Sequence, residues 1–250
     1  NIGFNASYTD SVYTADFFPK KPVIGYRNWS VNYPNHLTYD LHSDHIDADL
    51  KLMSDTSFVQ LASVKSDIGE DLLELKVGGV QIAEWIKLSP FAPPLSGVLE
   101  ADINVNYERK NFWGDGTVQL KDFHYNKQRV GDFALNANME HDPVAGKSEV
   151  YTNMVVNGSK VLYASCALAD SAATTPIGLD VELEEFPLYI IDPFIPNEMA
   201  MLEGYLSGNM KMSGDANHPM LNGQLSARQG AVNVPMMGAK INLPQTPITL

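Results

Sequence analysis

The chain has little sulfur chemistry, since Cys166 is the single cysteine among 250 residues. A lone thiol excludes an intrachain disulfide and a thiolate metal cluster, and it leaves the redox compartment open. Positive charge is also scarce, because 17 Lys and Arg stand against 30 Asp and Glu for a formal net charge of −13. This charge repels phosphate backbones and anionic headgroups at long range. We therefore expect no nucleic acid as a partner, and any lipid contact would run through apolar chains.

Long apolar runs are absent as well. No stretch of about 18 apolar residues occurs that would span a bilayer as a helix, and the first residues lack the basic-then-apolar pattern of a signal peptide. The sequence opens at Asn1 without methionine and ends at Leu250 inside an apolar alternation. We therefore expect a fragment of a longer protein, with export as one option.

Signatures of catalysis are missing from the sequence. Glu182, Glu184 and Glu185 lie along one predicted strand, without the facing carboxylate that glycoside hydrolysis needs. Ser165 shows neither a nucleophile elbow nor an assignable base, and no glycine loop has phosphate-binding spacing. We expect a chain that is not an enzyme, with no catalytic residues and no cofactor.

One segment concentrates possible metal ligands. It meets neither the spacing of a calcium loop nor that of a zinc site. We interpret it as a solvated acidic sheet edge, which protects a sheet against edge-to-edge association. The side chains concerned are His36, His42, Asp44, His45, Asp47 and Asp49.

Alternation of apolar and polar residues is the dominant pattern. It runs through residues 99–108 and returns at residues 73–77, 133–139 and 179–183. Antiparallel sheets with one solvated face produce such a period of two, whereas buried parallel strands read as continuous apolar runs. The sequence therefore predicts an all-β chain of antiparallel meanders.

Glycines near the C-terminus repeat earlier glycines at a fixed distance. A fixed period carried by turn residues and apolar faces is typical of an array whose units stack on one another. We interpret these glycines as turn residues that cut residues 202–250 into short strands. The pairs, each 107 residues apart, are Gly97 and Gly204, Gly116 and Gly223, and Gly131 and Gly238.

Two breaks in the alternation are also repeated. The segment IAEWIKLSPFAP at residues 82–93 is answered by FPLYIIDPFIP at residues 186–196. Each is predicted to form a short helix or turn that ends at its proline and packs as a plug between units. The predicted units, repeats of about 105 residues, are an incomplete first repeat with aromatic-rich N-terminal strands at 1–94, a second repeat at 95–201 and a truncated third at 202–250.

The unit that begins at Leu202 carries GYLSGNMKMSG and then Pro219, Leu221, Gly223 and Leu225. This arrangement resembles the TamB family, also called DUF490 or the translocation and assembly module family, within the AsmA-like group. The preceding FPLYIIDPFIP is similar to the family's apolar segment ahead of a glycine-rich strand. The stretch GYRNWSVNYPNHLTYD is similar to the Trp-containing opening strand of Bacteroides-like versions.

The resemblance implies an elongated antiparallel β half-pipe, or β-taco, whose concave face is an apolar groove. It implies a periplasmic location that spans between the inner and outer membranes, with an inner-membrane anchor outside this fragment. An outer-membrane Omp85-type barrel would be a partner of the full-length protein. The functions implied are phospholipid transport between the membranes and assistance to outer-membrane protein assembly.

In such a groove, phospholipid acyl chains would lie on aliphatic side chains, with about 0.8 kcal/mol gained per buried CH₂. Alternation alone also allows the same side chains to close on one another as the core of a sandwich or barrel. The residues predicted to line the lipid groove are Leu99, Ala101, Ile103, Val105, Phe133, Leu135, Leu179, Val181, Leu183, Leu206, Met210 and Met212.

Two rival functions remain open at this point. The first is a structural or chaperone-like β scaffold that engages outer-membrane protein strands by addition at open sheet edges. The second is a carbohydrate-binding β-sandwich that uses Trp29, Trp85 or Trp113. Exposed, coplanar aromatic faces would be the sign of the second.

Overall fold

The computed structural model describes residues 3–18, 21–24, 27–66, 69–87, 93–107, 113–142, 144–169, 178–195, 199–215 and 218–249. The chain divides into two compact units, Asn1–Leu120 and Lys121–Leu250. Strand β11 (Trp113–Tyr125) runs across this division. Within the described residues, no helix has the length and apolarity needed to cross a membrane.

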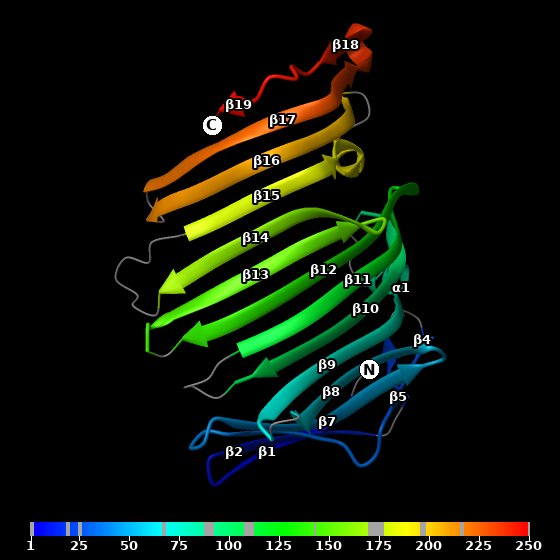
Figure 1. The fold of residues 1–250 in the computed structure, drawn as a ribbon. Coiled ribbons are helices and arrows are strands. Elements are labelled where there is room, and N and C mark those ends of the chain that lie inside the picture. Colours follow the sequence, from blue (N-terminus) through cyan, green and yellow to red (C-terminus); the bar gives the residue numbers. More distant parts are fainter. Residues whose placement is uncertain are drawn as a thin grey trace. The chain divides into compact units, whose positions relative to one another are not determined.

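Unit 1 consists of antiparallel strands and one short helix. β1 pairs with β2, β2 with β6, and the chain then runs as a meander from β6 through β7, β8 and β9 to β10 (Figure 1). β5 adds to β7, and β3 and β4 form a separate ribbon. The elements are β1 (Phe4–Thr9), β2 (Val12–Phe17), β3 (Val23–Ile24), β4 (Arg27–Asn28), β5 (Ser30–Val31), β6 (His36–Asp40), β7 (His45–Ser54), β8 (Ser57–Lys65), β9 (Asp71–Gln81), α1 (Ile82–Ile86) and β10 (Leu95–Asn106).

Unit 2 is a meander in which β12 to β17 lie side by side (Figure 1). β18 and β19 both pair with β17. The elements are β12 (Gln128–Asp142), β13 (Lys147–Val156), β14 (Ser159–Ala169), β15 (Gly178–Pro187), η1 (Leu188–Ile190), η2 (Asp192–Phe194), β16 (Met201–Asp215), β17 (His218–Val234), η3 (Pro235–Met237), β18 (Ala239–Asn242) and β19 (Ile248–Thr249).

The all-β antiparallel class predicted from the alternation is confirmed in both units. Among the described residues, no pairing joins the first and last strands of either meander, so each sheet is open. Short helical segments are confirmed at both predicted places, as α1 follows β9 and η1 and η2 follow β15. Their packing as plugs between units stays a prediction, and Pro193 lies inside η2 instead of ending it. The three predicted repeats stay a prediction, because compactness divides the chain at a different place.

The repeated glycines correct one expectation. Gly204 and Gly223 lie inside strands of 15 and 17 residues, β16 and β17, rather than at turns between short strands. The physical reason is close approach of neighbouring backbones, since a Cβ on Gly223 would lie 2.3 Å from the carbonyl oxygen of Asn209. Gly238 alone behaves as predicted, with a left-handed conformation at the end of η3.

β-Bulges bend several strands of unit 2. The register of β15 against β16 shifts between Leu183 and Phe186, where Glu185 has a φ of 47°. The register of β13 against β14 shifts after Met154, which leaves Val161 as an extra residue in β14. A bulge inserts one residue, increases the local twist and ends regular pairing.

A small buried cluster closes one end of unit 2. Val130, Val156 and Val161 are 2–3% exposed, and they pack with Ile190 of η1. Phe133 packs against this cluster and meets Phe123 edge to face, with ring centroids 5.9 Å apart. η1 therefore covers the sheet of unit 2 at this end.

The turn between β12 and β13 contains a carboxylate that titrates abnormally. Asp142 Oδ1 accepts hydrogen bonds from the backbone N–H groups of Ala145 and Val144, both at 2.9 Å. These bonds, that of Ala145 first, hold the pKa of Asp142 below its ordinary 3.8. The turn is therefore most stable above the unfolded-state pKa, and this contribution is lost as the pH falls through the lower folded-state pKa.

We expect a carboxyl ¹³C NMR titration of the folded protein to place the Asp142 midpoint below 3.8. The amide signals of Val144 and Ala145 should shift at the same midpoint, because they bond to the ionised form. A midpoint at or above the ordinary value would contradict this account of the turn.

Candidate functional site

Strand register places the predicted groove residues of unit 2 on a single face. Residues directly opposite one another in an antiparallel pair share a face of the sheet. Val181 of β15 lies opposite Ala164 of β14 and Met210 of β16. Continued across the sheet, the register gives three rows from β12 to β17. They are Leu135–Met154–Leu162–Leu183–Gly208–Leu225, Ala137–Thr152–Ala164–Val181–Met210–Gly223 and Met139–Val150–Cys166–Leu179–Met212–Leu221.

These rows form what we call the apolar face of unit 2. Its one hydroxyl side chain, Thr152, donates to the carbonyl oxygen of Asn136 at 2.9 Å and so is satisfied within the sheet. Leu206 and Phe133 extend the face beyond the rows, opposite Ala227 and Val156. A mainly aliphatic surface thus crosses six strands.

The opposite face of the same strands is polar. Lys211 Nζ lies 3.0 Å from Asp180 Oδ1 across β15 and β16. Asn136 Nδ2 donates to Asn153 Oδ1 at 3.0 Å across β12 and β13. These two cross-strand pairs therefore lie on the side opposite the apolar rows.

Burial shows that the apolar face is largely uncovered. Leu183 and Ala164 are buried at 9% exposure, whereas Leu135 is 41% exposed. Leu179, Val181, Leu206, Met210 and Met212 are half-buried. A sandwich or barrel core would bury such side chains fully, so within unit 2 the closed-core alternative is wrong.

Unit 1 repeats the arrangement over fewer strands. Ile103 lies opposite Leu75 of β9, which lies opposite Leu61 of β8 and then Leu50 of β7. Ala101 and Val105 continue the same face, opposite Val77 and Leu73, and Leu99 lies opposite Val80 beyond a register shift. The four predicted residues of β10 are half-buried.

Sequence analysis did not predict every residue of the apolar face of unit 2. Val150, Met154, Leu162 and Cys166 belong to it, as register shows. Their period of two was readable in β13, but neighbouring apolar residues such as Val155 and the bulge at Val161 obscure it in the sequence.

The tryptophans pack instead of presenting flat faces. Trp29 is 1% exposed, its Nε1 donates to Ile24 O at 3.2 Å, and its ring meets Trp85 edge to face at 5.9 Å. Trp113 Nε1 donates to Glu70 Oε2 at 3.1 Å. Coplanar exposed rings, the sign of the carbohydrate-binding alternative, are not formed by these three side chains.

The histidine- and aspartate-rich segment pairs within itself. His36 Nε2 and Asp47 Oδ2 are 2.9 Å apart, and the described residues hold no group of three or more metal-ligating side chains. His42 and Asp44 lie in the turn between β6 and β7.

Comparison of the chain with family models, with curated proteins and with solved structures found no match. The apolar faces of the two units are therefore the strongest guide to function.

Proposed function

We propose that the chain is a non-catalytic segment of a TamB-like periplasmic protein, whose apolar sheet faces shield phospholipid acyl chains during transport between the inner and outer membranes. The observation that carries this proposal is the half-exposed aliphatic surface across six strands of unit 2. The polar opposite face keeps such a sheet in water, which a surface apolar on both sides would not.

The chemistry of the face suits acyl chains. Each CH₂ removed from water gains about 0.8 kcal/mol, so a chain lying along several strands would be held without any polar anchor. Met210 and Met212 adapt to irregular apolar partners because their side chains are unbranched and polarisable. A negative chain also gains nothing from anionic headgroups, so the acyl chains would have to supply the contact.

The test is native mass spectrometry with lipid extraction, on the protein purified from a Gram-negative periplasm. The double variant Ile103→Asp, Val181→Asp places one carboxylate on the apolar face of each unit. An unpaired charge in an apolar contact is costly, so we expect co-purifying phospholipid to fall by at least about tenfold.

A control adds a single carboxylate to the polar face of unit 2, matching the Val181→Asp half of the double variant. Asn222 is exposed and lies opposite Lys211, so Asn222→Asp should keep its lipid. Equal lipid in both variants would contradict the proposal. A wild-type protein that is free of lipid but binds unfolded outer-membrane barrel strands would instead support the scaffold alternative. Cys166 lies on the apolar face between Val150 and Leu179, and slower thiol alkylation in the lipid-loaded protein provides a second readout.

A further inference from the structure

The hydrogen-bonded ladder between β14 and β15 stops before either strand ends. Pairing runs from Ala167 opposite Gly178 to Leu162 opposite Leu183. β14 nevertheless begins at Ser159, and β15 continues to Pro187. Ser159 and Lys160 therefore pair only with β13, and residues 186–187 pair only with β16.

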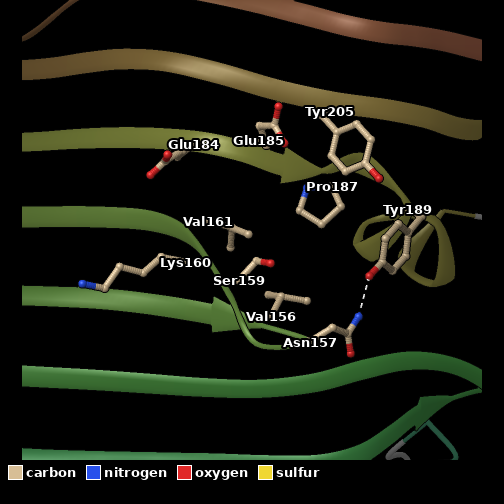
Figure 2. Close-up of a pocket in the computed structure, with 10 residues that line it drawn as sticks. All are labelled: Val156, Asn157, Ser159, Lys160, Val161, Glu184, Glu185, Pro187, Tyr189 and Tyr205. Atoms are coloured by element: carbon tan, nitrogen blue, oxygen red, sulfur yellow. Dashed lines mark hydrogen bonds between the residues drawn. The ribbon is translucent and has the colours of Figure 1, made fainter.

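A pocket of about 570 Å³ occupies the place where these two strands diverge (Figure 2). Its lining is mixed, because Val156, Val161 and Pro187 lie beside polar residues such as Asn157 and Ser159. Its volume falls within the range of about 300–1,000 Å³ that is usual for ligand-binding pockets. We call this pocket the β14–β15 slot.

Side chains at one end and along one side of the slot are held in place. Asn157 Nδ2 donates to the Tyr189 hydroxyl at 2.8 Å (Figure 2). Glu185 is paired with Arg228 at 2.7 Å, and the Arg228 guanidinium lies 4.9 Å from the ring centre of Tyr205. The ion pair joins the bulge of β15 to β17, and the Asn157–Tyr189 bond joins the β13–β14 turn to η1.

The other end of the slot carries charges of both signs. Lys160 of β14 and Glu184 of β15 extend toward this end in Figure 2. Neither side chain has an ion-pair partner among the described residues. A partner in the slot could therefore pair a negative group with the Lys160 amine and a positive group with the Glu184 carboxylate.

Backbone geometry shows which main-chain groups face the slot. Asn157 and Gly158 have φ values of 49° and 86°, as in a two-residue type I′ hairpin turn. The residues that flank such a turn, Val156 and Ser159, bond to each other across the hairpin. Consecutive residues of a strand direct their backbone groups to opposite edges, so Lys160 directs its N–H and C=O toward the slot.

We propose that the β14–β15 slot binds an extended peptide segment of another chain, which pairs with the open edge of β14 at Lys160 and so continues the ladder that β15 leaves. Main-chain hydrogen bonds provide the affinity in such strand addition, and pockets for alternate side chains provide selectivity. The mixed lining, with valines beside Ser159 and Lys160, suits a segment in which apolar and polar side chains alternate. The slot lies in unit 2 and acts independently of the lipid proposal.

The probe is a capped six-residue peptide that alternates threonine and valine, titrated into the ¹⁵N-labelled protein up to about 1 mM, where weak peptide complexes are populated. Amide signals of Lys160, Val161, Glu184 and Tyr205 should shift, and those of the distant β12–β13 turn should not. Two further peptides carry N-methyl groups on alternate amides, one set for each edge of the peptide strand.

N-methylation removes the donor from one edge and leaves the side chains unchanged. We expect one methylated peptide to bind at least about tenfold more weakly and the other to bind like the parent, since one edge alone faces β14. Equal affinity of all three peptides, absence of binding, or shifts mapping to the edge of β17 would each overturn the proposal.

A protein variant tests the same contact from the other side. Lys160→Pro removes the N–H that faces the slot, whereas Lys160→Ala keeps it. Binding should be lost in the first and retained in the second. Should the proline variant unfold, the methylated peptides still decide the question on the wild-type protein. The Ile103→Asp, Val181→Asp variant should bind the peptide normally, so failure of the lipid proposal would leave this result unaffected.

Discussion

Replacing Gly208 with alanine is expected to lower the free energy of unfolding of unit 2 by about 3–5 kcal/mol, through backbone strain and overpacking together. Gly208 has a φ of 145°, and a Cβ there would lie 2.0 Å from the carbonyl oxygen of Gln224 in the neighbouring strand. Backbone cannot yield to this contact as a flexible side chain would. β16 and β17 would have to move apart within their long paired stretch.

Gly178→Ala is the matched control for this change. No atom lies within 4 Å of a Cβ built on Gly178, and its φ is outside the left-handed region. We expect it to alter stability by less than about 0.5 kcal/mol, as is usual for surface substitutions. Urea unfolding followed by circular dichroism measures both variants. Similar midpoints for the two would contradict the close approach of β16 and β17.

Trp29→Ala is expected to cost unit 1 about 3–5 kcal/mol, the usual range for deleting a buried aromatic side chain. Trp29 is almost completely buried, and it carries both the edge-to-face contact with Trp85 of α1 and the hydrogen bond to Ile24 O. The substitution leaves a cavity beside α1 and removes the hydrogen bond to Ile24 O. α1 should lose its attachment to the sheet.

The control for this site is Val23→Ala, since Val23 lies in β3 beside Ile24 and is 53% exposed. It removes two methyl groups from the surface and should leave the unfolding midpoint nearly unchanged. Near-ultraviolet circular dichroism reports the packing of the indole rings directly. If Trp29→Ala keeps both the near-ultraviolet signal of Trp85 and the wild-type midpoint, the packing role assigned to Trp29 is wrong.

Alternation predicted the class of fold and the faces of β9, β10, β12 and β15 correctly, because a period of two depends only on strand geometry and on which side meets water. The helix of the first plug was also predictable, since Ile82, Trp85 and Ile86 have helical spacing. Proline was a poorer guide, because Pro193 lies inside η2. Residues 88–92 of the first plug segment and residue 196 of the second lie outside the described residues.

The roles of the glycines were not predictable from their spacing. Glycine serves equally in a turn, a bulge or a close contact between strands. Sequence alone does not tell which neighbour approaches Gly204 or Gly223. Long strands with internal glycines therefore read as short strands with turns.

The β14–β15 slot was beyond sequence analysis for a related reason. It depends on two bulges, at Val161 and at Glu185, that lie in different strands and bend them apart. Neither position has a glycine or proline to signal a break. The charged residues Glu184 and Glu185 were interpreted as part of a solvated face. Both are exposed, but they also line the slot.

The order of the strands in unit 2 also determines how the chain can assemble. From β12 to β17, each strand pairs with the strand directly before it and the strand directly after it. The entropic cost of closing each loop therefore stays small, and contact order is low for a β protein. Unit 1 differs, because β2 must find β6 and β5 must find β7 across intervening chain. Unit 2 can thus add strands in the order in which they leave the ribosome, whereas unit 1 must wait for distant segments to meet.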